Sequence, residues 1–214
     1  MMTDRVMTFT PYGDRLEPET VQAVLNLDWA GDITHVFQHA PQTGNAREDI
    51  LRQYQRGREL FLGSDCEYML VIESDIIPPP DTLKKLMSLK ADCGYGVYVF
   101  RKTPVINIFN KYSPTAKNPG ESLDIHPHKL RRALQAQRIE CSGAGLGCVL
   151  IKRHVLKDID FRLAPNAHCD TWFNLDVFRG RYSQMADMSV VCGHKDEHGK
   201  ILWPGYATDA QKRV

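Results

Sequence analysis

Two acidic residues separated by one position follow directly on an apolar run. Residues 68–72 are continuously apolar, and Glu73, Ser74 and Asp75 come next. In an extended chain alternate side chains point to the same side, so the two carboxylates can face one ligand. A hard divalent cation held by one or two carboxylates can neutralise the negative charge of a diphosphate. The structural alternative is that Asp75 caps a turn and Glu73 forms a salt bridge.

A histidine late in the chain can serve the same ion. His194 follows Gly193 and the apolar run 188–192. Imidazole is an acceptable ligand for Mn²⁺-type ions, which also take carboxylates. The sequence therefore offers Asp75 and His194 as ligands of Mn²⁺ or Mg²⁺. The alternative is that this histidine is structural or solvated.

A further carboxylate stands at the expected start of a helix. Asp170 precedes residues 171–178, which are typical of a short helix, and Asp is a good helix N-cap. The same side chain could act as a general base that removes a proton from an acceptor hydroxyl. Capping and catalysis do not exclude each other.

A glycine-rich segment at residues 142–147 follows the middle of the chain. Three glycines in five residues allow positive φ and a close backbone approach to a ligand. The spacing matches neither a Walker loop nor a dinucleotide fingerprint. We expect Gly143, Ala144 and Gly145, together with Trp172, to contact an acceptor; a plain loop is the alternative.

The elements that must position these residues alternate along the first half. Residues 6–9, 33–38 and 68–72 are predicted as strands and 10–13 as a turn. Helices are predicted from Glu19, over 47–62 and after Asp81. This βαβ rhythm predicts an α/β protein with a mostly parallel central sheet flanked by helices.

The second half predicts strands at 94–100, 105–109, 148–151 and 188–192 and a smaller extension on the acceptor side. Its distinctive part is a basic segment at 110–138, read as a loop. The basic residues are Lys111, Lys117, His126, His128, Lys129, Arg131, Arg132 and Arg138. This segment could bind an anionic acceptor, such as nucleic acid with a modified base or a phosphorylated glycan. A solvated, charged loop is the alternative.

Composition limits the class of protein. The chain has 214 residues, a net charge of +1 and 43% hydrophobic residues, which suits one core and gives no global field toward nucleic acid or membranes. No stretch approaches the roughly 20 apolar residues of a membrane span, and the first residues are unlike a signal peptide. Six cysteines without a C-x-x-C pair favour a reducing cytoplasm over a zinc site.

In their order, these motifs resemble those of GT-A-fold glycosyltransferases, especially of the family 2 type. The resemblance rests on the segments 7–11, 45–47, 70–79, 94–102, 142–153, 168–173 and 190–194. It spans nearly the whole chain as one domain over 1–214, with a nucleotide-binding half at 1–102 and an acceptor-binding half at 103–214.

The resemblance implies a metal-dependent, inverting transfer of a sugar from a nucleotide diphosphate, with a UDP-sugar as the expected donor. Asp75 would be the principal metal ligand and His194 the second, and Asp170 would be the base. Glu73 would act through water or the ribose. The remaining nucleotide contacts would come from Thr10, Pro11, Tyr12, Arg47 and Ser74.

Two functions from other classes stay open. A sugar-phosphate nucleotidyltransferase would need a Gly-rich loop with Arg or Lys straight after the first strand, and residues 10–14 are not such a loop. A non-catalytic nucleotide-sugar-binding module would bind UDP without hydrolysing a donor.

Overall fold

A seven-stranded sheet forms the centre of the molecule. The computed structural model describes residues 4–103, 105–108, 127–163 and 168–212. The strand order is β2-β1-β3-β7-β5-β8-β6. The strands are β1 (Val6–Tyr12), β2 (Ile33–His39), β3 (Tyr68–Ile72), β5 (Cys93–Val97), β6 (Arg138–Glu140), β7 (Cys148–Lys152) and β8 (Gln184–Val191).

Most of the sheet runs in one direction. Five strands point the same way: β2, β1, β3, β5 and β8. The strand β7 is antiparallel to both of its neighbours, β3 and β5, and β6 is antiparallel to β8. The expectation of an α/β protein with a mostly parallel central sheet is confirmed, and only β6 and β7 run against the others. Because β7 runs the opposite way, the glycine-rich segment before it reaches the edge where β3 and β5 end.

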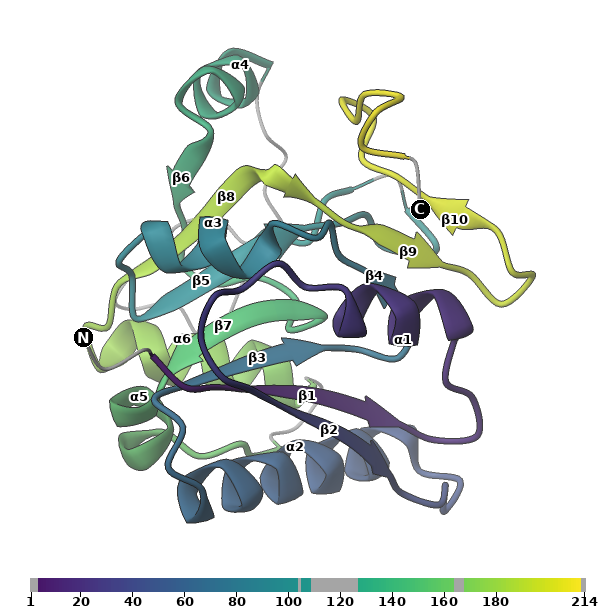
Figure 1. The fold of residues 1–214 in the computed structure, drawn as a ribbon, viewed down its shortest axis with the longest axis vertical. Helices are drawn as coiled ribbons and strands as arrows, with labels where there is room; N and C mark the ends of the chain where they lie inside the picture. Colours follow the sequence, from purple (N-terminus) through teal and green to yellow (C-terminus); the bar gives the residue numbers. More distant parts are fainter. Residues whose placement is uncertain (1–3, 104, 109–126, 164–167, 213–214) are drawn as a thin grey trace.

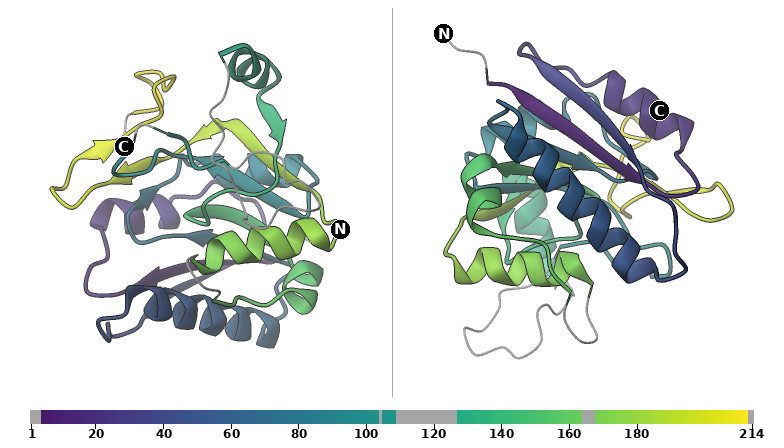
Figure 2. Two further views of the ribbon diagram at one scale, coloured as in Figure 1. Left: turned by 180° about the vertical axis from the view of Figure 1, so that it is seen from behind. Right: turned by 90° about the horizontal axis from the view of Figure 1, so that it is seen from below.

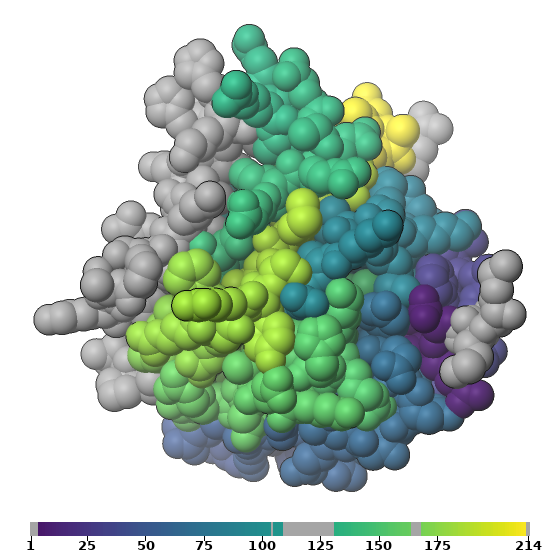
Figure 3. Space-filling model, turned by 90° about the vertical axis from the view of Figure 1, so that its left-hand side faces the viewer, coloured from purple at the N-terminus to yellow at the C-terminus, as the bar shows by residue number. Residues whose placement is uncertain are grey.

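Helices cover both faces of this sheet (Figures 1 and 2). On one face lie α1 (Pro18–Leu25) and α3 (Thr82–Ser88), and on the other α2 (Ala46–Gly63), α5 (Arg153–Asp158) and α6 (Cys169–Arg179). The helix α4 (Pro127–Ala136) stands out from the body with β6 (Figures 1 and 3). None of the described helices is long and apolar enough to cross a membrane.

The central strand β3 explains the continuous apolar run. Met69 and Val71 belong to the core under α2 and α6, and Leu70 and Ile72 belong to the core under α1 and α3. All four side chains are fully buried. A strand covered on both faces needs apolar residues at every position, so no alternation is left in the sequence.

A small second sheet brings distant segments together. It has the order β10-β9-β4, with β4 (Ile76–Ile77), β9 (Gly193–Lys195) and β10 (Ile201–Leu202). Ile76 lies opposite His194, and the backbone N–H of Lys195 donates to the carbonyl of Asp75 at 2.8 Å. This pairing places the strand-end carboxylate beside the late histidine.

Three predicted elements differ in the structure. The turn expected at 10–13 starts later, because β1 continues through Pro11; β3 pairs with β1 only as far as Phe9, so Pro11 faces one partner strand and its missing N–H is tolerated. Residues 105–108 form no strand but two isolated bridges, Val99 with Ile106 and Ile108 with Ala144. Of the basic segment, residues 110–126 lie outside the described residues and 127–136 form a helix, not a loop.

The close contact of α2 with the sheet depends on Gly57. A Cβ at this position would meet the ring of Phe9 at 2.5 Å, and Phe9 is fully buried. We therefore expect Gly57→Ala to lower the free energy of unfolding by about 1–3 kcal/mol through overpacking. Thermal unfolding should register this as a Tm that falls by roughly 2–4 °C per kcal/mol.

Gly63 in the same helix is the matched control, because a Cβ there would meet no atom within 4 Å. Gly63→Ala should keep or slightly raise the Tm, since Ala has the higher helix propensity. Equal Tm changes in both variants would show that Gly57 is not held by its contact with Phe9.

Candidate active site

A cavity of about 630 Å³ lies at the edge of the sheet where β1, β3 and β5 end. Its wall is formed by the end of β1, the helix α2, the residues that follow β3 and β5, and the strand β9. In open α/β sheets this edge is where ligands bind. Six of the expected site residues line the cavity: Pro11, Tyr12, Glu73, Ser74, Asp75 and His194.

Asp75 and His194 lie close enough to share a ligand. Oδ2 of Asp75 is 3.6 Å from Nε2 of His194. The other ring nitrogen, Nδ1, donates to the carbonyl of Val99 at 2.7 Å, which leaves a lone pair on Nε2. Burial lowers the pKa of His194, so the imidazole is neutral at neutral pH. This tautomer and charge state are those of a metal ligand.

The guanidinium of Arg101 contacts both members of this pair. Its Nη2 forms an ion pair with Oδ2 of Asp75, and its Nε donates to Nε2 of His194 at 3.2 Å. Arg101 follows β5 in a turn and is 40% exposed in its side chain. A positive group of the chain itself is therefore bound where a cation would be held.

The donor set at this point fits Mn²⁺ or Mg²⁺. The carboxylate oxygen suits either ion, whereas the imidazole nitrogen is better suited to Mn²⁺ than to Mg²⁺. Such ions usually keep several water or phosphate ligands besides one or two from the protein. Among the residues that the structure describes, no group of three or more His, Cys, Asp or Glu side chains could hold a metal ion. The protein thus offers two ligands, and phosphate oxygens and water would have to supply the rest.

Glu73 lies deeper in the same cavity and has a protein partner. The hydroxyl of Tyr54 donates to Oε1 of Glu73 at 2.7 Å. Burial raises the pKa of Glu73, and the nearby negative charge of Asp170 raises it further. The structure therefore brings Asp170 close to Glu73, although Asp170 is not one of the residues that line the cavity.

The environment of Asp170 differs from the predicted helix cap. α6 begins at Cys169 with His168 as its N-cap, so Asp170 is in the first turn. Its Oδ1 accepts from the backbone N–H of Thr171 at 2.7 Å and from the Thr171 hydroxyl at 3.2 Å. Burial raises the pKa of the Asp170 carboxyl, yet the residue keeps some exposed surface.

The glycine-rich segment has a structural role. Gly143 has φ of 136°, and a Cβ there would meet Cγ of Asn174 at 2.4 Å. Nδ2 of Asn174 donates to the carbonyl of Ala144 at 2.6 Å, which ties the segment to α6. Gly145 abuts the Tyr98 hydroxyl in the same way. The close approach is to the chain itself, and all of these residues are buried, which gives no support for acceptor contacts from residues 143–145.

Three further expected contacts lie outside the cavity wall. Thr10 lies within β1, which continues to Tyr12, and its side chain is fully buried. Arg47 is in the first turn of α2 and does not line the cavity. Trp172 is partly exposed, with the Arg162 guanidinium 4.5 Å from its ring centroid.

Several residues of the site were not assigned a role from the sequence. Tyr54 and Gln53 come from α2, and Gln53 donates to the carbonyl of Tyr12 at 3.2 Å. Arg101 and Lys102 come from the turn after β5. The helical spacing of α2 marks Tyr54 only as core, and a basic pair after a strand has no distinctive pattern, so only the tertiary fold identifies them.

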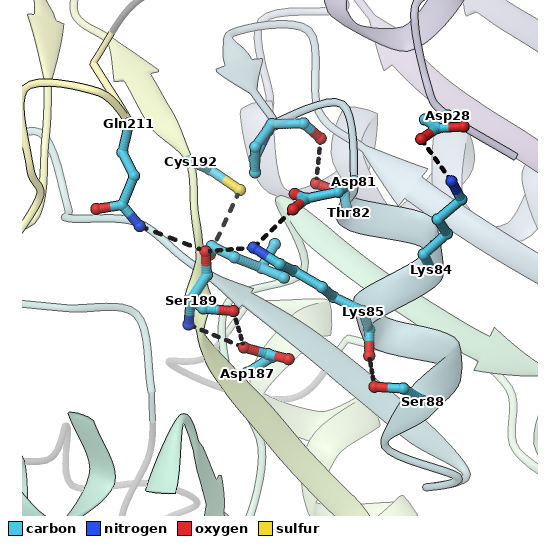
Figure 4. Close-up of polar contacts among 12 residues, drawn as sticks. Asp28, Asp81, Thr82, Lys84, Lys85, Ser88, Asp187, Ser189, Cys192 and Gln211 are labelled. Carbon is cyan, nitrogen blue, oxygen red and sulfur yellow. Dashed lines mark hydrogen bonds and ion pairs between the residues drawn. The ribbon is translucent and has the colours of Figure 1, made fainter. Parts of the chain in front are cut away.

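A second cavity, of about 470 Å³, lies between α1, α3 and β8. Figure 4 shows the Lys85 ammonium directed at the Asp81 carboxylate (2.8 Å) and the Ser189 carbonyl (3.3 Å). Asp187 accepts from both the N–H and the hydroxyl of Ser189. These groups satisfy each other and join α3 to β8, so the first cavity is the better candidate site.

Together, the sheet and the cavity at its carboxyl edge define a Rossmann-like α/β protein. No protein-family model matches the chain, and no curated protein does. Among solved structures 189 chains match. One is "Crystal Structure of A197 from STIV", with 16% identity, a TM-score of 0.64 and coverage of 98% of this chain and 97% of that one. This likeness extends over the whole chain and concerns the fold.

The raised pKa of Asp170 predicts a stability cost at neutral pH. Below an ordinary carboxyl pKa of 3.8 the group is protonated in both states; as the pH rises, the unfolded chain loses the proton first, so the folded state becomes less stable. Asp170→Asn removes the charge and keeps an oxygen that can accept from Thr171. We expect a higher Tm than wild type at neutral pH and a difference that shrinks toward pH 4.

Asp209→Asn is the control, since Asp209 is 98% exposed in its side chain, and it should leave the Tm unchanged. A lower Tm for Asp170→Asn at neutral pH would contradict the assignment of a buried, costly charge.

Proposed function

We propose that the protein is an inverting glycosyltransferase of the GT-A type that transfers a sugar from a nucleotide diphosphate to an acceptor hydroxyl. The observation that supports this most is the meeting of Tyr12, Glu73, Asp75 and His194 in one cavity at the carboxyl edge of the sheet. Its volume of about 630 Å³ is within the range of small-molecule sites.

In this proposal the nucleotide lies along the end of β1. Pro11 and Tyr12 give a flat, mostly apolar surface for the base, for which uridine is our proposal. Ser74 and Gln53 offer polar groups to the ribose. Mn²⁺ or Mg²⁺ held by Asp75 and His194 would stabilise the charge of the departing diphosphate.

Asp170 serves as the general base in the transfer step. It accepts the proton of the acceptor hydroxyl, whose oxygen attacks the anomeric carbon on the side opposite the diphosphate. The bond between this carbon and the diphosphate oxygen breaks, and its electron pair leaves with the nucleoside diphosphate. A raised pKa makes Asp170 a stronger base than an ordinary aspartate. Glu73 is held by the hydrogen bond from Tyr54. In this proposal its side chain lies between the base, Asp170, and the two metal ligands, Asp75 and His194.

The acceptor is proposed to bind on the side of α6 and α4. Trp172 is two residues from Asp170, and its buried Nε1 has no hydrogen-bond partner among the described residues. Arg131, Arg132 and Arg138 are exposed on α4 and β6. They suit an anionic acceptor, of which nucleic acid with a hydroxyl-bearing base is one form and a phosphorylated glycan another. A cytoplasmic location, inferred from the unpaired cysteines, is part of the same proposal.

Donor binding gives the first test. At a concentration of about 100 times its Kd, a bound donor adds about 2.7 kcal/mol to the stability of the folded state. This raises the Tm by roughly 5–10 °C for a chain of this size. In a screen of nucleotide sugars with Mn²⁺, we expect one donor to give this shift with the wild type and Asp170→Asn, and a much smaller one with Asp75→Asn. Donor hydrolysis and transfer should be lost in both variants.

Asp14→Asn is the matched control for Asp75→Asn, because Asp14 is exposed and lies beside the cavity without lining it. It should behave as the wild type. A donor that binds without being hydrolysed or transferred would favour the non-catalytic binding module, and transfer by Asp170→Asn at the wild-type rate would exclude Asp170 as the base.

Acceptor affinity should depend on salt. If Arg131, Arg132 and Arg138 each neutralise one phosphate of single-stranded nucleic acid, affinity falls roughly 20-fold between about 50 and 200 mM salt. The double variant Arg131→Gln/Arg132→Gln keeps one contact and should lose only roughly threefold. Fluorescence anisotropy with an oligonucleotide that carries a hydroxyl-bearing base measures both slopes. If affinity depends on salt equally in the wild type and the double variant, Arg131 and Arg132 of α4 do not bind the acceptor.

A further inference from the structure

The atoms of Asp75 and His194 that suit a metal ion already have a partner. Nη2 of Arg101 pairs with Oδ2 of Asp75, and Nε of Arg101 donates to Nε2 of His194 at 3.2 Å. These two acceptor atoms are 3.6 Å apart and face the cavity. Arg101 therefore uses the same two donor atoms that a divalent ion would need.

The two cations exclude each other at the histidine. A neutral imidazole has one lone pair, and Nδ1 of His194 carries the proton that it donates to the Val99 carbonyl. The lone pair of Nε2 can accept from the Arg101 N–H or coordinate an ion, but not both. Like charges a few ångströms apart also repel one another inside a partly buried site. Binding of the ion thus requires the guanidinium to leave.

Arg101 has a suitable place to move to. It lies in a turn, its side chain is 40% exposed, and both Arg101 and Lys102 line the same cavity. A guanidinium released from Asp75 keeps its charge and frees its N–H donors, which bind phosphate oxygens in a bidentate manner. A diphosphate in the cavity would offer such oxygens.

We propose that Arg101 is a diphosphate-binding residue that the Asp75–His194 pair holds until a divalent ion displaces it. This inference rests on the proposed function and adds a coupling to it. The ion frees the guanidinium for the diphosphate, and the diphosphate keeps the guanidinium away from the ion site. Each ligand therefore strengthens the binding of the other by the same factor.

Calorimetric titration with Mn²⁺ alone tests the displacement. Arg101→Gln removes the competitor, so this variant should bind Mn²⁺ about tenfold more tightly than the wild type, the scale of one charge-assisted contact. Lys102→Gln is the matched control: it removes one positive charge from the same cavity but touches neither ligand, and should change Mn²⁺ affinity less than twofold. Asp75→Asn should abolish the binding.

Titration with pyrophosphate at saturating Mn²⁺ tests the second position of the arginine. Arg101→Gln should bind pyrophosphate about tenfold more weakly than the wild type, although it binds the ion more tightly. Loss of one positive charge by itself favours a cation and disfavours an anion, and Lys102→Gln measures that share in both titrations. Changes in Arg101→Gln that exceed those of Lys102→Gln in both directions are expected only if the guanidinium occupies the two positions in turn.

The inference is overturned if Arg101→Gln binds Mn²⁺ no more tightly than the wild type, or if it tightens the ion no more than Lys102→Gln does. Neither result bears on glycosyl transfer, which the donor screen measures with the wild-type protein. If the wild-type protein transfers sugar but Arg101→Gln does not bind Mn²⁺ more tightly, the proposed function holds and only the displacement of Arg101 is wrong.

Discussion

The pairing of two short strands is the constraint on which the candidate site depends. β4 follows the acidic pair, β9 contains the late histidine, and their antiparallel register sets Ile76 opposite His194. The hydrogen bond from Lys195 to the Asp75 carbonyl fixes the same register one residue further on. A slip by one residue would turn the imidazole to the other face of the sheet. Without this pairing, neither the 3.6 Å distance nor the contact with Arg101 would exist.

The parts of the structure that follow local patterns were predictable. The apolar run of β3, the helical spacing of α2 and the order of strands and helices in the first half appear in the structure at nearly the expected positions. The acidic pair at the end of β3 was identified for the same reason: a buried strand ends abruptly, and its polar residues then lie at the carboxyl edge of the sheet. Local signals therefore give the elements and one side of the site.

What the sequence left out depends on contacts between distant segments. Arg101 gains its importance only because the turn after β5 lies beside β9, and Tyr54 only because α2 crosses the end of β3. The glycines at 143 and 145 predict a close backbone approach, but only the structure shows that Asn174 and Tyr98 lie against them. The direction of β7 was equally hidden, because parallel and antiparallel central strands have the same apolar composition.

The distance along the chain between Asp75 and β9 has a consequence for folding during synthesis. Strands β1 to β3 come from the first third of the chain and can pair with each other as soon as they are synthesised. The imidazole arrives some 120 residues after Asp75, with the last strands. A nascent chain can thus pair β1, β2 and β3 while Asp75 still lacks the imidazole beside it, and the cavity at the sheet edge is completed only after β9 has been synthesised.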